Sequence, residues 1–593
     1  MEFLTRPDIT GTFGVATSTH WIASAVGMRI LEIGGNAFDA GAAMGFVLHV
    51  VEPHLNGPLG DMPALIKPAG DAAPTVVCGQ GTAPAHATID HYKDQGLDLI
   101  PGTGLLATVI PGAFDAWMLI LRDHGSLPLR SILEPAIYYA RSGHPLLPRV
   151  ANTIANLAPF FQDEWPTSYQ TWLSGGVAPE AGDLFCNPVL ADTWDQLLTE
   201  AEQKSDRADQ IQHARAAFYR GFVAEHIDTW MQSACVMDAT GERRKGVLTG
   251  DDMANWSATY ERPLSTEYHG WTVWKGGAWT QGPSLLQSLN ILSGCSLNNT
   301  NDADFVHTVT ETMKLAFADR EGYYGDPDHT DLPMELLLST EYSDARRNLI
   351  GEDASLEQRP GHVPGFEYCA QAAIERAAQP IPTSNAVGAG EPTMAHLTEK
   401  RGDTVHLDVI DRWGNMISAT PSGGWLQSSP IVPGLGMPLN TRAQMFWLDE
   451  GLPTSLAPGR RPRTTLSPSM ACTPDQTLAF GTPGGDQQDQ WQLIYLLRLI
   501  HSGMGLQAAL EAPLFHSNHF QSSFYPRAAR PAHLMVEPAL GADVISNLRA
   551  LGHDVEISDA WSIGRLTAAA RRSDRVLSAA ATPRLMQAYA VGR

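Results

Sequence analysis

The stretch GDTVHLDVIDRWGNMISATPSGGW, residues 402–425, decides the expected fold. Near its start, Val405, Leu407 and Val409 alternate with polar or charged neighbours. An alternation with a period of two is typical of a strand that turns one face to the core and the other to solvent. The pattern therefore predicts a half-buried strand that opens at Thr404.

A tight turn follows this strand. The run 411–415, DRWGN, contains a glycine and an asparagine, the residues that most readily adopt the positive φ of hairpin turns. Residues 416–420 should then return antiparallel to the first strand. With the turn centred just before its glycine, Thr404 lies opposite Gly423 and close to the hydroxyl of Ser422. Taken alone, this stretch would be an ordinary hairpin with polar ends.

Two later stretches add weight to a catalytic interpretation. RPRTTLSPS at 461–469 and GTPGGD at 481–486 follow the hairpin. Together with GDTVH and the WGN turn, they resemble the gamma-glutamyltranspeptidase family of N-terminal nucleophile hydrolases. The resemblance implies an α+β fold, a four-layer αββα sandwich in which two sheets lie between layers of helices.

The resemblance also implies that the chain is a precursor that cuts itself between Asp403 and Thr404. The large fragment, 1–403, and the small fragment, 404–593, would stay associated. Thr404 would then be the nucleophile, with its own α-amine as the base. That amine has a reference pKa of about 7.7–8.0, so a substantial fraction is neutral near physiological pH. A catalytic triad is therefore unnecessary, and the sequence contains no GxSxG motif.

Five further residues match catalytic or binding positions of the family. Gly484 and Gly485 correspond to the loop whose backbone amides stabilise the oxyanion. Ser422 corresponds to the threonine that hydrogen-bonds the nucleophile. Thr464 and Thr465 lie where the family has two serines that contact the substrate carboxylate. Each of these last three positions retains a hydroxyl.

Other positions depart from the family pattern. Gln80 replaces the arginine that binds the γ-glutamyl carboxylate, and Gly424 replaces an asparagine. The run NTRAQMF places Arg442 and Met445 where the family has groups for the α-amine. Each lost charge-assisted contact would cost roughly 1.5–3 kcal/mol, so a different acyl group is expected, with Arg442 in its recognition. Alternatively, Arg442 points to solvent or pairs with Asp449.

Composition limits the class of protein. The 593 residues are 43% apolar and 18% charged, which is typical of a globular protein, and the length predicts two or more lobes or one large layered domain. A net charge of −24 opposes binding to nucleic acid or to an anionic membrane. The six cysteines have no paired spacing, so we interpret them as reduced packing residues and expect no cofactor. The start of the sequence lacks a signal-like pattern, which favours the cytoplasm.

The remaining chain reads mainly as scaffold. Residues 22–33 and 39–51 have the spacing of two helices joined through a GGN turn. Residues 150–245 are expected to be mostly helical. The stretch 351–400 is rich in proline, glycine and alanine, and we interpret it as a long irregular linker that leads to the cleavage site.

One pair of residues could be taken for half of a metal site. His307 and Glu311 are four positions apart, which places both on one face of a helix. No further ligands follow at a recognised spacing. We therefore expect no metal.

The leading hypothesis is a self-processing amide hydrolase or acyltransferase. Its substrate would be a small-molecule amide, its acceptor water or an amine, and its acyl group need not be γ-glutamyl. One alternative is a true γ-glutamyl hydrolase or transferase that acts on glutathione-like compounds. Another is a catalytically silent scaffold or binding protein. The sequence leaves hydrolysis versus transfer, and further oligomerisation, open.

Overall fold

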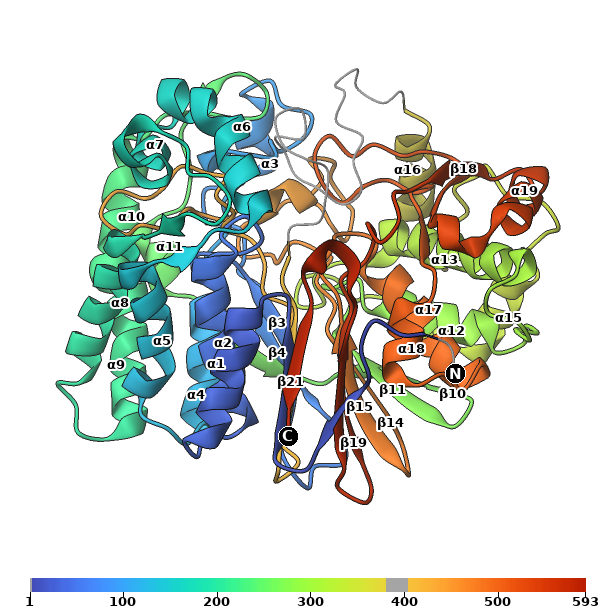
Figure 1. Ribbon diagram of the computed structural model, residues 1–593. Coiled ribbons are helices and arrows are strands. Elements are labelled where there is room, and N and C mark those ends of the chain that lie inside the picture. The colour runs from blue at the N-terminus through green and yellow to red at the C-terminus, as the bar shows by residue number, and fades with distance from the viewer. Residues whose placement is uncertain (1–2, 380–403) are drawn as a thin grey trace.

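Two large β-sheets pack face to face, and helices cover both outer faces (Figure 1). The computed structural model describes residues 3–379 and 404–593. The four-layer sandwich predicted from the sequence is confirmed. In the described ranges, no helix combines the length and the apolar run that a membrane span requires.

The first sheet contains the hairpin that opens at Thr404. All its strand pairs are antiparallel. In spatial order its strands are β21 (Tyr589–Gly592), β2 (Gly14–Ser18), β12 (Leu407–Asp411), β13 (Met416–Ala419), β3 (Met62–Lys67), β4 (Thr75–Gly79) and β9 (Thr259–Glu261).

The second sheet faces it and is also antiparallel. Its order is β1 (Ile9–Gly11), β20 (Leu577–Ala581), β19 (Thr567–Arg572), β15 (Gln476–Gly481), β14 (Ser469–Thr473), β11 (Trp271–Lys275) and β10 (Leu264–Tyr268). Each sheet thus draws strands from both sides of residue 404. Two fragments divided at that point would share both sheets.

One helical layer covers the first sheet. Its members are α1 (Trp21–Glu32), α2 (Ala37–Val51), α4 (Ala113–His124), α5 (Leu129–Ser142), α8 (Pro188–Ala201) and α9 (Arg207–Tyr219). Helix α2 is buried along its whole length and packs on Leu407, Val409 and Ile417 of the sheet. Its start is fixed by a capping box in which Asn36 and Asp39 satisfy backbone amides.

A second helical layer covers the other sheet. It consists of α12 (Pro283–Leu292), α13 (Ala303–Tyr323), α17 (Gln488–His501) and α18 (Leu506–Glu511). These helices and the strands beneath them form a separate apolar core. Residues just before α12 and at the start of α17 approach each other near the end of β15, which places them at the candidate site described below.

The other helices and small sheets surround these layers. The helices are α3 (Ile89–Lys93), α6 (Pro148–Glu164), α7 (Pro166–Trp172), α10 (Phe222–Ser233), α11 (Gly250–Ala254), α14 (Met334–Leu337), α15 (Thr340–Arg347), α16 (Glu367–Ala377) and α19 (Ala542–Ala550). The remaining strands are β5 (His144–Pro145) with β6 (Leu184–Phe185), β7 (Val236–Met237) with β8 (Arg243–Arg244), and β16 (Phe515–Ser517), β17 (His533–Val536) and β18 (Asp554–Ile557).

Several expectations can now be compared with the fold. The helix pair 22–33 and 39–51 is confirmed as α1 and α2, and residues 150–245 are mostly helical. The half-buried strand is wrong: every residue of β12 is buried, because helices cover one face and the second sheet covers the other. The irregular linker 351–400 is also wrong in part, since it contains α16, and its residues 380–400 lie outside the described ranges.

Candidate active site

The hairpin at the centre of the first sheet places Thr404 opposite a hydroxyl. β12 and β13 pair with Leu407 opposite Ala419, and an isolated bridge extends this register to Thr404 and Ser422. The predicted pairing of Thr404 with Gly423 is therefore wrong by one residue. The side chains of directly opposed residues point to the same face, and here that face carries both hydroxyls.

The turn explains the shift in register. The Asp411 carboxylate Oδ1 accepts hydrogen bonds from the backbone N–H groups of Trp413 at 2.9 Å, Gly414 at 2.9 Å and Asn415 at 3.0 Å. This acid gathers the three amides into a loop centred on Trp413 rather than between Trp413 and Gly414. The predicted hairpin itself is confirmed.

Thr404 is almost completely buried, with 2% of its surface exposed. Its Oγ1 lies 3.1 Å from the Oγ of Ser422. Ser422 also exchanges backbone hydrogen bonds with Asp61, at 2.8 and 2.9 Å. Thr404, Ser422 and Asp61 therefore form one row across three neighbouring chain segments. Asp403, the other half of the predicted cleavage site, lies outside the described residues.

The glycine loop reaches the same end of the sandwich. β15 crosses over β12, because a Cβ added to Gly481 would come within 2.2 Å of the His406 ring. One residue earlier, the Phe480 carbonyl accepts a 3.5 Å hydrogen bond from Ser418, which pairs with Asp408. Phe480 of β15 therefore lies next to the Ser418–Asp408 pair, and Gly481 lies next to His406. This direction leads toward Thr404, so the residues that follow β15 lie beside Thr404.

We call residues 482–486 the oxyanion loop, after the role that the sequence resemblance predicts for its glycines. Gly484 has φ of +112°, and a Cβ at this position would lie 2.8 Å from the Trp491 ring, so only glycine fits without strain. Within the described chain, the backbone N–H groups of Gly484 and Gly485 donate to no acceptor. They are free to donate to a ligand.

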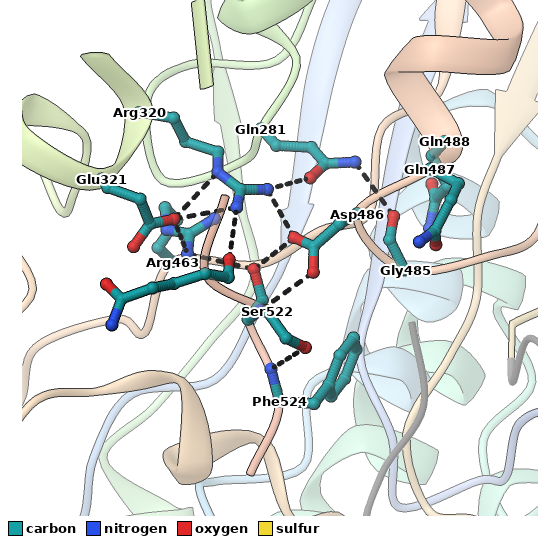
Figure 2. Close-up of polar contacts among 12 residues, drawn as sticks. Gln281, Arg320, Glu321, Arg463, Gly485, Asp486, Gln487, Gln488, Ser522 and Phe524 are labelled. Atoms are coloured by element: carbon teal, nitrogen blue, oxygen red, sulfur yellow. Dashed lines mark hydrogen bonds and ion pairs between the residues drawn. The ribbon is translucent and has the colours of Figure 1, made fainter. Parts of the chain in front are cut away.

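A buried ionic network holds the C-terminal end of this loop (Figure 2). Asp486 lies 2.5 Å from Nη1 of Arg320 and accepts hydrogen bonds from the backbone and hydroxyl of Ser523 at 2.9 and 2.6 Å. Glu321 pairs with Arg320 at 2.8 Å and with Arg463 at 3.1 Å. Burial alone would raise the pKa of Asp486, but Arg320 and Arg463 outweigh it and lower the pKa below its usual value.

The two threonines of the RPRTTLSPS stretch are fully buried. The backbone N–H of Thr464 donates to the Trp279 carbonyl at 2.7 Å, which fixes the segment against the connection between β11 and α12. The Thr465 hydroxyl has no hydrogen-bond partner among the described residues. A buried hydroxyl without a partner is costly unless something else binds it. Thr465 therefore has the better geometry of the two for a ligand contact.

Arg442 is buried and paired with an acid that the sequence analysis missed. Its Nη2 lies 2.9 Å from Oδ1 of Asp61, and its guanidinium lies 5.2 Å from the centre of the Trp425 ring. Both alternatives for Arg442, solvent and Asp449, are wrong. Asp449 instead lies 3.9 Å from Arg376. In the sequence, Asp61 stands out as the single acid of the otherwise uncharged run 53–66, and this feature could have identified it.

Asp61 and Arg442 have unused hydrogen-bonding capacity. Burial raises the pKa of Asp61 above its usual value, although the Arg442 guanidinium opposes that rise. Asp61 Oδ2 and Arg442 Nε are both buried and lack partners in the described ranges. One ion pair thus retains one free acceptor and one free donor, next to the row that contains Thr404.

Gln80 and Gly424 also lie near this row. Gln80 follows Gly79, the last residue of β4, which pairs with the residue after Asp61. Its Nε2 donates to the Gly81 carbonyl at 3.2 Å, and its buried Oε1 has no partner in the described chain. Gly424 has φ of +66°, and a Cβ at this position would lie 3.2 Å from the Gly60 nitrogen, so the asparagine of the family pattern would be crowded by backbone here.

A second buried network lies behind Thr404 on the same strand. The His406 ring is 2.9 Å from the Thr420 hydroxyl and 3.0 Å from Asp408. Asp408 also accepts hydrogen bonds from Thr17 at 3.1 Å and from Thr567 at 2.9 Å. Because Thr567 belongs to the second sheet, this network ties the two sheets together beneath the site. The sequence analysis missed it.

The structure adds a third residue to the pair considered as a metal site. His553 lies 2.9 Å from His307, and both are near Glu311. However, the Glu311 carboxylate pairs with Lys314 and, at 2.9 Å, with Arg359. Two cations already neutralise the only acid of the group, so its donor set is poorly suited to a metal cation.

Comparisons with known proteins agree with the geometry. Residues 23–592 match the family model described as gamma-glutamyltranspeptidase. The oxamate amidohydrolase proenzyme of Klebsiella pneumoniae is 30% identical, with 97% of each chain covered. The glutathione hydrolase-like YwrD proenzyme of Bacillus subtilis is 29% identical, with 93% of this chain and 92% of that protein covered. The solved structure of LmbA2991HD is 50% identical, with full coverage of both chains and a TM-score of 0.92. The chain therefore belongs to the gamma-glutamyltranspeptidase family and is an enzyme of its self-processing amidohydrolase type.

Proposed function

We propose that Thr404 is the nucleophile of this enzyme once the bond between Asp403 and Thr404 is cut. The observation that supports this most strongly is the position of the Thr404 hydroxyl, 3.1 Å from Ser422 and at the end of the sandwich where the oxyanion loop emerges. Ser422 orients the hydroxyl. The α-amine released by the cut is the base.

The reaction then has two halves. The α-amine takes the proton of the Thr404 hydroxyl while Oγ1 bonds to the acyl carbon, and the carbonyl oxygen becomes an oxyanion that the loop amides stabilise. The C–N bond breaks, and the leaving amine takes the proton from the α-ammonium. Water, or an amine acceptor, repeats the attack on the ester, and the acid or new amide leaves as the Thr404 hydroxyl is restored.

The proposed acyl group is one without a free α-amine and with an oxo or acidic end. Neither Gln80 nor Met445 supplies the charge that a γ-glutamyl head would need at these positions. Arg442 offers donors to a carbonyl or carboxylate. Asp61 neutralises much of the Arg442 charge, which favours the oxo end over a full carboxylate. The relative named oxamate amidohydrolase supports the part of this proposal that concerns an acyl group without a free α-amine.

One observation favours a second candidate, a γ-glutamyl hydrolase or transferase. Asp61 and Arg442 together provide one anion and one cation, and a γ-glutamyl head has one ammonium and one carboxylate. For this candidate the ion pair between Asp61 and Arg442 would have to separate. Asp61 would then bind the ammonium, and Arg442 would bind the carboxylate. The relative named glutathione hydrolase-like YwrD proenzyme is consistent with it. A panel of γ-glutamyl anilides, glutaryl anilides and small 2-oxo amides separates the two candidates.

Processing provides the first test. Wild type should separate into two fragments on a denaturing gel, with a new amino terminus at Thr404. Thr404→Ala should remain one full-length chain, and Thr404→Ser, which keeps a hydroxyl, should still be cut. An intact wild-type chain after prolonged incubation would refute the proposed function.

A further inference from the structure

Two buried glutamines bind consecutive carbonyl groups of the oxyanion loop, and Figure 2 shows the contact that Gln281 makes. Nε2 of Gln488, the first residue of α17, donates to the Gly484 carbonyl. Nε2 of Gln281, just before α12, donates to the Gly485 carbonyl at 3.1 Å. The two peptide units on either side of Gly485 are therefore each held by a side-chain amide.

The orientation of both side-chain amides is determined by their other contacts. The backbone N–H of Ser467 donates to Oε1 of Gln488 at 3.1 Å. Nη1 of Arg320 donates to Oε1 of Gln281 at 2.8 Å. An amide oxygen accepts but cannot donate, so each NH2 group must face the loop. Rotating either amide by 180° would bring two donors together at one end and two acceptors together at the other.

The trans peptide bond converts these contacts into a direction for the N–H groups. In a trans peptide the C=O and N–H point in opposite directions. When Gln488 holds the Gly484 carbonyl, the N–H of Gly485 points away from Gln488. When Gln281 holds the Gly485 carbonyl, the N–H of Asp486 points away from Gln281. Both N–H groups are without an acceptor in the part of the chain that the structure describes.

We propose that Gln488 and Gln281 are positioning residues that immobilise the peptide planes on both sides of Gly485. This inference rests on the proposed role of the oxyanion loop. A Gly-Gly pair has wide conformational freedom, and a donor that must reorganise during the reaction stabilises an oxyanion less than a fixed one. Gln488 holds the peptide plane that carries the Gly485 donor. Gln281, together with the backbone N–H of Gln488 at 3.2 Å, holds the next plane through the Gly485 carbonyl, so the freedom of Gly485 is removed before the substrate binds. The two glutamines act through the backbone and need not touch the substrate.

The test compares Gln488→Met and Gln281→Met with Gln507→Met in processed enzyme. Gln507 is a matched control, because it is buried and hydrogen-bonded to the backbone of Ala581, in a different strand, away from the loop. Rates are measured with glutaryl and γ-glutamyl p-nitroanilide, using whichever wild type hydrolyses faster. Each loop variant should lower kcat by about 10- to 100-fold, less than the loss of a whole donor, with KM within threefold of wild type. Gln507→Met should keep the wild-type kcat.

Gln488→Glu provides a second variant in case the methionine change prevents folding. It keeps the length of the side chain but loses the NH2 donor, so it should also lower kcat. A folded, processed loop variant with kcat within twofold of wild type, or with a change confined to KM, would overturn the inference. Wild type that is never cut would instead refute the proposed function, whatever the glutamine variants do.

Discussion

On one side of Thr404, the oxyanion loop is held by Gln281, Gln488 and the Arg320 network, and its side-chain contacts are almost fully paired. On the other side, the group of Asp61, Gln80 and Arg442, which we call the head wall, contains three buried polar atoms without partners in the described ranges. Stabilising an oxyanion requires fixed donors. Recognising an acyl group requires donors and acceptors that a ligand can satisfy. The paired oxyanion loop is therefore suited to the reaction itself, and the head wall with its unpaired atoms is suited to substrate specificity.

The largest effect on turnover should come from changing the oxyanion loop. Gly485→Val would crowd the approach of the acyl group to the loop amides, and turnover should fall by about 10²–10³-fold. Stability should change little by comparison. Gly351→Val is the control, because a Cβ at that exposed position would meet no atom closer than 3.9 Å. Unchanged turnover in folded Gly485→Val would mean that the loop does not participate in the reaction.

A smaller effect, of about tenfold, is expected from the head wall. Loss of one charge-assisted contact is worth roughly 1.5 kcal/mol or more. Arg442→Gln should reduce the preference for glutaryl over γ-glutamyl p-nitroanilide, because both carry a carboxylate and only the γ-glutamyl group carries an ammonium, which the lost cation no longer repels. Asp61→Asn should increase that preference, because the guanidinium is no longer neutralised. Asp449→Asn is the control, since Asp449 is more than half exposed and 3.9 Å from its partner. Equal preferences in all three variants would exclude the head wall from acyl recognition.

The smallest effect concerns the pH dependence of stability, for which Asp486 and Asp61 should differ in sign. The pKa of Asp486 is lowered by Arg320 and Arg463 against the effect of burial, so its stabilising contribution is present above the unfolded pKa and is lost as pH falls through the folded pKa. The pKa of Asp61 is raised by burial, so its ionisation costs stability at neutral pH, and that cost disappears as pH falls through its folded pKa.

Chemical denaturation of the Thr404→Ala protein, as one intact chain, measures this difference. Between pH 7 and pH 3, the stability advantage of the parent over its Asp486→Asn variant should shrink. Over the same pH range, the stability of the parent relative to its Asp61→Asn variant should increase. The two changes should have opposite signs, because the pKa of Asp486 is lowered and that of Asp61 is raised. Changes of the same sign would show that the two carboxylates do not lie in contrasting environments.

Short-range sequence patterns predicted the elements that depend on local chemistry. The helix pair α1 and α2, the hairpin and the glycine loop all follow from periodicity, turn residues and strand ends. The one-residue error in register came from Asp411, whose side chain gathers three amides, a contact that turn statistics do not contain. The burial of β12 was missed because it depends on the second sheet, whose strands are far away in the sequence.

The candidate site residues also divide into those that a local sequence pattern predicts and those that depend on distant segments. Thr404, Ser422 and the glycine pair lie in recognisable motifs, and the structure brings them to one end of the sandwich. The Asp61 contact to Arg442 spans 381 positions along the chain. No pattern in either segment predicts that contact, because it arises only when the chain before Arg442 pairs with the chain before Asp61, through the bridge between Leu59 and Leu439.

The division of both sheets at residue 404 has a consequence for how the protein can be made. As one chain, the strands on either side of the cut find each other in a unimolecular step whose rate is independent of dilution. After the cut, two separate chains would have to complete the same sheets, so recovery from full unfolding becomes concentration-dependent. Processing would then convert a molecule that can refold on its own into one whose activity, once lost by unfolding at low concentration, does not return.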